Sequence, residues 1–354
     1  MRAITYTRYG GPDVLRVEEV PRPTAQEDEV LVRVKAVEAT KGDCEMRSFR
    51  YAVKWFWLPL RIALGVRRPR RRILGMYFSG EIVSTGAAVT RFSAGDAVFG
   101  TAGFRMGAYA EYLAVPQRNT IITKPRNMDP ADAAAVPLGG LNALHFMRRA
   151  AIRPGQRVLI NGAGGSIGLH ALQIAKAMGA EVTVVDHTIK EAALLRLGAD
   201  RFIDYTRSDF AAEGQRYDVV FDMVPRSSYS DCIRILNPGG RYLCGNPRLS
   251  VMIRSLFTSW LTDKSASFAF ATESMEELET LKQMIEDGEI RSIVDRIYPM
   301  DEAADAHRPQ QRIGNHASLG DANVEGQVGV VVDGDVQHVA GAEAIVARRG
   351  HRGR

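Results

Sequence analysis

The sequence has 354 residues, of which 45% are hydrophobic and 25% charged, and its formal net charge is +5. This composition is typical of a globular protein long enough for two domains, and it excludes a chain that is disordered throughout. No apolar run is long enough for a membrane span, and the first residues, "MRAITYTRYGG", lack a signal-peptide pattern. The widely spaced Cys44, Cys232 and Cys244 fit no disulfide framework, so we expect a soluble cytoplasmic protein with reduced thiols.

The first part of the chain alternates short β-like runs with turn signals. Examples are "RAITYT", "DEVLVRVKAVEAT", "GEIVSTGAAV" and "DAVFGTAG", each followed by turn-forming residues such as glycine or proline. Period-two runs of this kind favour antiparallel strands. The sequence predicts an irregular β-rich domain over residues 1–125.

The texture changes after residue 125. Asp129 before Pro130 favours a helix start, and from Gln156 strand-like and helix-like segments alternate, beginning with "RVLIN", "GLHALQIAKAMG" and "EVTVVD". Parallel strands joined by crossover helices explain this alternation most simply. We therefore predict an α/β chain whose second domain, residues 126–268, is a doubly wound parallel sheet.

Two segments follow that domain. Residues 269–332 contain the helical pattern "MEELETLKQMIEDGEI" and the strand-like "VDRIYPM" and "VGVVV", and we expect them to return to the first domain. Residues 333–354 form an atypical basic tail, which we expect to be partly disordered or an added helix.

A glycine-rich turn in "LINGAGGSIGLHALQ" lies directly after a predicted strand and before a predicted helix. Glycine allows a tight turn and lets main-chain N–H groups approach a pyrophosphate, while the helix N-terminus supplies partial positive charge. The context predicts a dinucleotide site made by Gly162, Gly164, Gly165, Ser166, Ile167 and Gly168. The alternative is a turn that only packs helix on strand.

The end of the next strand bears on the choice of dinucleotide. Asp186 lies about twenty residues beyond the turn, where such folds hydrogen-bond the adenosine ribose, and this favours NAD. His187 and Lys190 follow at once and could neutralise the 2′-phosphate of NADP, so both coenzymes stay open.

Several segments resemble the medium-chain dehydrogenase/reductase superfamily, and within it the zinc-free quinone oxidoreductase branch. The matching segments are "YTRYGGPDVLRVEEVPRP", "GDAVFG", "GAYAEYLAV", "AAAVPLGGLNALH", "AGGSIG", "LGADRFIDY" and "LNPGGRYL". They span roughly residues 1–308 in the order and spacing of the family. The resemblance implies a GroES-like catalytic domain joined to a Rossmann domain, and a homodimer formed through the Rossmann edge strand.

The resemblance also shows where a metal would bind. The zinc-dependent alcohol dehydrogenase branch has a ligand cysteine three residues before an aspartate, and later a His-Glu pair after a glycine. Here Thr40 stands at the cysteine position before Asp43, and Met76 and Tyr77 replace the His-Glu pair. Zinc prefers thiolate, imidazole and carboxylate ligands, and Cys44 is out of register, so we predict no metal.

Without zinc, hydride addition to a quinone or an enone is easier than alcohol oxidation, because hydrogen-bond donors can hold the developing oxyanion. By position in the family, the resemblance implies catalytic roles for Thr40, Asp43, Arg47 and Tyr51. The plainer alternatives are a loop-capping carboxylate for Asp43 and a half-buried aromatic for Tyr51. In many such reductases the cofactor does most of the chemistry.

Further cofactor contacts are implied by position. Asn142 would lie near the nicotinamide and Tyr205 along the adenine edge, and the carboxamide would meet the backbone of Cys244, Gly245 and Asn246. Turn and helix-cap roles are the alternative for these residues.

Residues 51–72 form a basic, aromatic insert, "YAVKWFWLPLRIALGVRRPRRR". Together with "LSVMIRSLFTSWLTDK", it could cap a hydrophobic substrate pocket, rest on anionic lipid, or pack between subunits. No nucleic-acid-binding module accompanies the arginines, so we expect no nucleic acid partner.

The sequence therefore predicts a zinc-independent, NAD(P)H-dependent reductase of quinones or α,β-unsaturated carbonyls, with a small hydrophobic substrate. One alternative is an NAD(P)-binding regulatory or membrane-associated protein without turnover. Another is an alcohol dehydrogenase.

Overall fold

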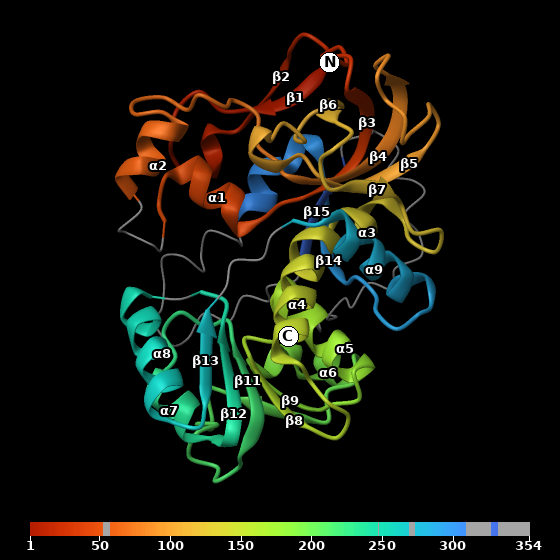
Figure 1. Cartoon of the computed structure of the whole chain (residues 1–354). Helices are drawn as coiled ribbons and strands as arrows, with labels where there is room; N and C mark the ends of the chain where they lie inside the picture. Colours follow the sequence, from red (N-terminus) through yellow and green to blue (C-terminus); the bar gives the residue numbers. More distant parts are fainter. Residues whose placement is uncertain (52–56, 247, 269–272, 309–326, 332–354) are drawn as a thin grey trace, which may run out of the picture.

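The computed structural model describes residues 1–51, 57–246, 248–268, 273–308 and 327–331. They form two lobes, each built around one β-sheet (Figure 1). The predicted strand at "VGVVV" lies in the described part, whereas the predicted tail, 333–354, and residues 52–56 of the basic insert lie outside it.

The first lobe contains a seven-stranded sheet in the order β14-β15-β3-β4-β5-β7, with β6 also paired to β3. Most of β3 is buried on both faces, as its apolar sequence "EVLVRVKAVE" requires of a central strand. β15 pairs antiparallel to β3, so the last described segment closes the sheet of the first lobe. The bounds are β3 (Glu29–Glu38), β4 (Tyr77–Thr85), β5 (Ala97–Thr101), β6 (Tyr112–Pro116), β7 (Ile121–Thr123), β14 (Val294–Pro299) and β15 (Gln327–Val331).

Two short helices and a small ribbon complete the first lobe (Figure 1). They are α1 (Lys41–Ser48), α2 (Trp57–Leu64) and the antiparallel pair β1 (Arg2–Thr5) and β2 (Arg16–Glu19). α1 follows β3 after two residues, so it starts at the end of a central strand. This connection fixes the position of the segment that carries the predicted catalytic residues.

The second lobe contains a six-stranded parallel sheet in the order β10-β9-β8-β11-β12-β13. Numbered along the chain, this is the order 3-2-1-4-5-6 of a dinucleotide-binding Rossmann sheet. The predicted α/β fold with a doubly wound parallel sheet is confirmed. The bounds are β8 (Arg157–Asn161), β9 (Glu181–Asp186), β10 (Arg201–Asp204), β11 (Tyr217–Asp222), β12 (Leu236–Cys244) and β13 (Ser265–Phe268).

Helices cover this sheet and connect it to the first lobe. α4 packs against α5 and α9, and α9 also contacts β7, so the helices form a bridge between the two sheets. The bounds are α3 (Pro130–Ala134), α4 (Val136–Ala150), α5 (Ser166–Ala177), α6 (Glu191–Arg196), α7 (Tyr229–Arg234), α8 (Leu249–Leu261) and α9 (Met275–Glu286).

None of the helices in the described ranges combines the length and the apolar character that crossing a bilayer requires. The domain boundaries predicted at residues 125, 268 and 332 stay predictions.

Candidate functional site

The strand order places a switch point between β8 and β11, because the chain leaves β8 toward one side of the sheet and returns to the other. In open α/β sheets, ligands bind at this point, outside the carboxyl ends of the strands. Asn161 and Asp222, the last residues of the two strands, are joined by a 2.9 Å bond from the amide Nδ2 to the carboxylate Oδ1. This bond holds the two strand ends together beside the glycine turn.

The predicted glycine turn links β8 to α5 at this switch point. Gly162 has φ +85°, a conformation that favours glycine, and α5 begins at Ser166. A Cβ on Gly168 would lie 2.5 Å from the carbonyl oxygen of Gly162 and 2.6 Å from Cα of Ala163. Glycine at position 168 therefore lets the helix pack directly on the turn, with its N-terminus toward the expected pyrophosphate. Ile167, inside the first turn of α5, is half-buried.

Asp186 is already engaged with the turn. Its Oδ2 accepts a 2.7 Å hydrogen bond from the N–H of Gly164, and its Oδ1 lies 3.4 Å from the ammonium Nζ of Lys190. Lys190 Nζ also donates to the carbonyl oxygen of Gly164. Both side chains are about nine-tenths buried, with exposed fractions of 9% for Asp186 and 11% for Lys190. The acid expected to bind the ribose is therefore paired with a lysine that crosses the turn.

Glu38, a residue that the sequence analysis did not single out, joins the two lobes at the same place. It is the last residue of β3 and is only 3% exposed. The hydroxyl of Ser166, at the start of α5, donates to its Oε1 over 3.4 Å, and its Oε2 has no hydrogen-bond partner among the described residues. Burial raises the pKa of Glu38 well above its ordinary value, helped by the nearby Asp43 carboxylate. The only signal in the sequence that could have identified Glu38 as a site residue is its position as an acid inside the apolar run "AVEAT".

Thr40 and Asp43 form a capping box at the start of α1. The Thr40 hydroxyl donates to Asp43 Oδ2 over 2.6 Å and accepts from the Asp43 N–H over 3.0 Å, while the Thr40 N–H donates to Asp43 Oδ2. The other oxygen of Asp43 accepts from the N–H of Gly75. Burial raises the pKa of Asp43, although these hydrogen bonds oppose the shift. The geometry is that of the capping carboxylate considered above.

Arg47 lies within a buried polar cluster in the first lobe. Its side chain is fully buried, its Nε donates to the Gly10 carbonyl, and burial lowers its pKa. His307 is also fully buried, with Nδ1 3.3 Å from Cys44 Sγ and Nε2 2.9 Å from the Tyr109 hydroxyl. Burial and the charge of Arg47 lower the pKa of His307 to about 3. The contact of His307 with Cys44 thus attaches the C-terminal part of the chain to α1.

Tyr51 lies beyond α1, with its ring 5.2 Å from that of Phe49 in an edge contact. Its hydroxyl oxygen is buried and has no hydrogen-bond partner within the described ranges. Burial raises its pKa, so the hydroxyl stays protonated. It is therefore a donor for which the described part of the chain supplies no acceptor.

Of the remaining predicted cofactor residues, Tyr205, Cys244, Gly245 and Asn246 lie at the carboxyl ends of strands of the parallel sheet, whereas Asn142 lies on α4. Asn142, on α4, donates to the carbonyl of Leu138, and Tyr205, just after β10, is 53% exposed with its ring beside His187. Cys244 ends β12, the Gly245 N–H donates to the Asp222 carbonyl, and the Asn246 amide donates to the Met223 carbonyl. These predicted contacts thus come from the ends of two strands, β10 and β12, and from one helix, α4.

The positions that hold zinc in the alcohol dehydrogenase branch have other roles. The Thr40 hydroxyl is committed to the cap of α1, and Met76 packs against the hydrophobic core of the first lobe. No three His, Cys, Asp or Glu side chains gather into a ligand set in the part of the chain that the structure describes.

Comparison with known protein families gives two matches. Residues 26–126 match the family described as "Alcohol dehydrogenase GroES-like domain", and residues 197–313 match "Zinc-binding dehydrogenase". The first match covers the β-rich lobe and the second covers much of the parallel sheet and the return segment.

Similar proteins agree with these matches. The chain is 28% identical over 322 residues to the quinone oxidoreductase of Sus scrofa, covering 87% of this chain and 93% of the relative. It is 29% identical over 319 residues to the NADPH-dependent alkenal/one oxidoreductase, chloroplastic, of Arabidopsis thaliana, covering 86% and 75%. The solved quinone oxidoreductase of Coxiella burnetii superposes with a TM-score of 0.80 at 28% identity, covering 94% and 99%.

Proposed function

This chain belongs to the medium-chain dehydrogenase/reductase superfamily, and we propose that it reduces quinones or α,β-unsaturated carbonyls by hydride transfer from a nicotinamide coenzyme. The observation that carries the proposal is the contact between Glu38 and Ser166, which brings the end of β3 to the glycine turn. The segment with the predicted catalytic residues follows directly after Glu38. Relatives whose names specify quinone and alkenal/one reduction support the same chemistry.

The reaction needs few groups from the protein. The bound coenzyme would supply the hydride. The negative charge then develops on the acceptor oxygen, where a hydrogen-bond donor stabilises it. We propose Tyr51 as that donor, because its hydroxyl is protonated and lacks an acceptor among the described residues. The Thr40 hydroxyl already donates to Asp43 Oδ2, so Thr40, Asp43 and Arg47 would position the segment.

We propose that this chemistry proceeds without zinc. The donor set does not suit the metal, since a capping hydroxyl at Thr40 and a thioether at Met76 stand where the zinc-dependent branch has thiolate and imidazole. Cys44 and His307 are close together, but Tyr109 completes the contacts of that imidazole. Zinc bound by three protein ligands is the usual catalytic arrangement, and these residues do not supply it.

For the coenzyme we propose NADPH over NADH. A free carboxylate at the end of β9 would repel a 2′-phosphate, but Lys190 lies 3.4 Å from Asp186 and offsets its charge. The sequence-based preference for NAD considered only the carboxylate of Asp186 and not its contact with Lys190.

We also propose a cellular location and partners for the chain. Cys44, Cys232 and Cys244 are buried and form no disulfide, which supports a reducing compartment such as the cytoplasm. The basic and apolar residues of the segment 57–72 support a contact with anionic lipid. For a homodimer, the outer strand β13 is the expected interface. There, Ser259 of α8 already accepts from the Ala266 N–H and donates to its carbonyl. Edge pairing must therefore use the remaining groups of β13 or displace α8.

The test is oxidation of NADPH and NADH by the purified chain with 1,4-quinone and enone acceptors, with and without a strong chelator. We expect turnover that the chelator does not change, and a lower kcat for Tyr51→Phe with little change in coenzyme affinity. Coenzyme binding without turnover would instead identify a regulatory protein. Oxidation of simple alcohols that the chelator abolishes would identify a zinc-dependent alcohol dehydrogenase.

A further inference from the structure

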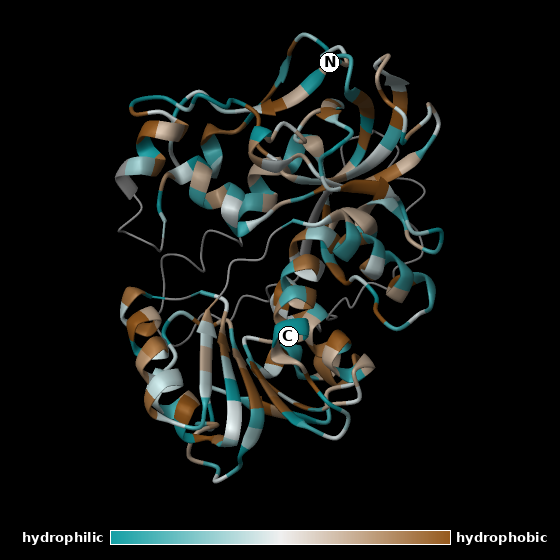
Figure 2. Cartoon of the chain, viewed as in Figure 1, coloured by the Kyte–Doolittle hydropathy of each residue, from teal (hydrophilic) through white to brown (hydrophobic). Residues whose placement is uncertain are grey.

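Helix α8 exposes its apolar side. Its residues Leu249, Ile253, Leu256, Phe257, Trp260 and Leu261, here called the α8 stripe, are between 49% and 78% exposed, with Trp260 the most exposed. In Figure 2, much of the α8 ribbon, on the outside of the lower lobe, has the brown colour of hydrophobic residues. A helix that covers a core turns its apolar stripe inward, whereas α8 packs Val251 against the core and leaves most of its large apolar side chains exposed.

Polar contacts hold the helix in this orientation. Thr258 accepts a 2.7 Å hydrogen bond from the Tyr229 hydroxyl, and Ser259 bonds both the N–H and the carbonyl of Ala266 on β13. Ser255, on the same inner side, is 1% exposed. Rotating α8 to bury the stripe would break these contacts, so the exposed stripe is a fixed feature of the surface.

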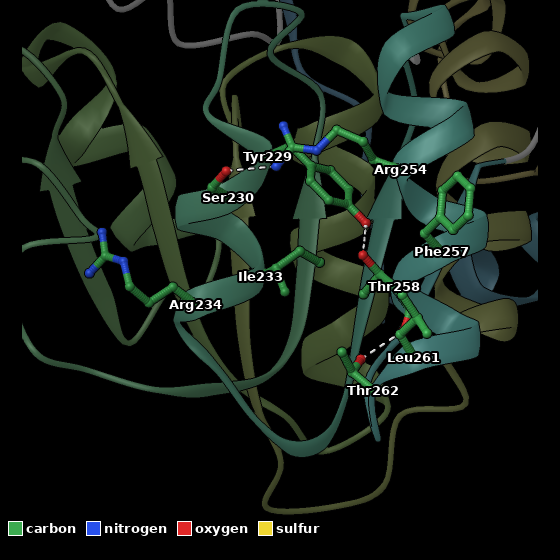
Figure 3. A pocket seen from close by; sticks show the side chains of 9 residues that line it. All are labelled: Tyr229, Ser230, Ile233, Arg234, Arg254, Phe257, Thr258, Leu261 and Thr262. Carbon is green, nitrogen blue, oxygen red and sulfur yellow. Dashed lines mark hydrogen bonds between the residues drawn. The ribbon is translucent and has the colours of Figure 1, made fainter.

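Basic groups border the stripe. Arg254 lies over the ring of Tyr229, 4.6 Å from its centroid, and donates to the Ser230 hydroxyl rather than to an acid (Figure 3). It stands at a groove of about 480 Å³ between α7 and α8, which Phe257 and Leu261 also line. Arg248, at the start of α8, is exposed and forms no ion pair with any described residue. The border of the stripe is therefore cationic.

The acids near the groove are already engaged. Asp231 pairs with Arg234 on α7, and Asp263, after the end of α8, accepts from the N–H of Gly239. Neither acid forms an ion pair with Arg248 or Arg254 within the described residues.

The first lobe repeats this combination of apolar and basic groups. Ile62, on α2, and Val66, just after it, are 55% and 59% exposed, and the basic run of Arg67, Arg68, Arg70 and Arg71 follows. All four arginines are exposed, and none pairs with a carboxylate in the ranges that the structure describes. α2 and α8 lie on the same side of the molecule, one on each lobe (Figure 1).

We propose that the α8 stripe, together with the end of α2 and the basic run, docks onto the surface of a membrane that contains anionic phospholipids. Apolar helices with basic borders lie in the interfacial plane of such membranes, where acyl chains receive the stripe and head groups receive the arginines. The alternative occupant is a second copy of the chain. A second copy would offer the exposed arginines of the basic run another apolar and basic surface, whereas anionic head groups offer negative charge, so charge complementarity favours the lipid.

This inference goes beyond the contact proposed for residues 57–72, because it assigns the main apolar anchor to α8 on the other lobe. It does not depend on the reaction, and it can hold or fail independently of turnover.

The experiment measures binding of the full chain to vesicles of phosphatidylcholine alone and of phosphatidylcholine mixed with phosphatidylglycerol, by flotation and by tryptophan emission. The chain has three tryptophans, Trp55, Trp57 and Trp260, and Trp260 belongs to the α8 stripe. We expect binding to the anionic vesicles only, with a blue shift of the emission. The double variant Leu256→Glu/Trp260→Glu should bind at least tenfold more weakly, and replacing the four arginines of the basic run by Gln should reduce the preference for anionic vesicles.

The matched control is Phe104→Glu, because Phe104 is a single apolar side chain, 90% exposed, in the loop after β5. It should bind vesicles like the original chain, and the thermal unfolding midpoints of all variants should agree. Equal binding by the stripe variant, or no binding by the original chain, would overturn the proposal. A dimer that the stripe variant converts into a monomer, with no vesicle binding, would assign the stripe to a second copy.

Discussion

At the scale of single residues, two acids at the switch point have opposite electrostatic environments. Asp186 has a lysine beside it and accepts two backbone hydrogen bonds, from Gly164 and His187, which stabilise its charge. Glu38 has one weak donor and a raised pKa. A neutral acid beside the pyrophosphate turn does not repel the coenzyme, whereas an ionised one would.

Replacing Glu38 should therefore change the pH dependence of coenzyme binding. As pH rises through the raised pKa, Glu38 loses its proton and NADPH binding to the original chain should weaken. Glu38→Gln, which mimics the neutral acid, should bind NADPH equally well at low and high pH. Titration of coenzyme fluorescence across the pH range measures this, with the exposed Glu289→Gln as control. Identical pH profiles for the original chain and Glu38→Gln would contradict the prediction.

The free energy of unfolding should also depend on pH through Glu38. Because the folded chain holds the Glu38 proton above the ordinary pKa, it binds more protons than the unfolded chain there, and its free energy of unfolding falls as pH rises. Glu38→Gln should remove the part of this decrease in the free energy of unfolding that comes from Glu38.

Coenzyme choice should depend on Lys190. Lys190→Ala leaves Asp186 without its counter-charge, so the affinity for NADPH should fall about tenfold, as expected for loss of a charged contact, and that for NADH much less. Asp186→Ser should strengthen NADPH binding relative to NADH. Parallel dissociation constants for the two coenzymes give the answer. A loss shared equally by both coenzymes with Lys190→Ala would show that this lysine does not select between them.

At the scale of elements, the junction of β8 and α5 depends on glycines of two kinds. A Cβ at position 168 would collide with the backbone of the turn, whereas one at position 164 would meet the far end of the Lys190 side chain, 2.2 Å from its Cδ, and Asp186 Oδ2 at 2.9 Å. The backbone cannot move as easily as a lysine side chain.

Gly168→Ala should consequently lower the free energy of unfolding by about 1–3 kcal/mol, the usual cost of overpacking, and Gly164→Ala by less. Urea unfolding of the two variants beside the original chain measures both values. Equal losses would mean that the turn adapts at both positions.

The same junction shows what could be predicted from sequence. The strand, the turn and the helix are local, and Gly162 and Gly168 are required by backbone geometry within a few residues, so the pattern was sufficient. The contact of Glu38 with Ser166 joins residues 128 positions apart, and no local pattern encodes it. For Asp43, the threonine three residues earlier is a capping signature, but the same spacing carries functional residues in the family, so sequence alone could not separate the two roles.

At the scale of the whole molecule, the chain closes its first lobe with its C-terminal part. β15 completes the sheet beside β3, and the buried His307 bonds to Cys44 and Tyr109. β15 covers most of the strand-like run "VGVVV" that the sequence analysis expected to return to the first domain, and it pairs with β3 although it lies well beyond His307 in the chain.

The lowered pKa of His307 makes this closure sensitive to acid. The unfolded chain binds a proton at this residue below pH 6.5, whereas the folded chain resists it down to about pH 3. The free energy of unfolding should therefore fall as pH drops through this window, by up to about 1.4 kcal/mol per pH unit. His307→Gln, which keeps a polar partner for Tyr109, should lose that part of the slope in urea unfolding at several pH values. Parallel slopes below pH 6.5 would contradict it.

The double hydrogen bond of Ser259 to Ala266 has a consequence for solubility. An open border of a sheet invites foreign strands to add to it, which is a route to fibrils and precipitates. Here one hydroxyl occupies both main-chain groups of the residue at that border. Ser259→Ala would remove this hydroxyl and leave both main-chain groups of Ala266 open to another strand. The variant should therefore aggregate at a lower temperature than the original chain, even if its catalytic activity is unchanged.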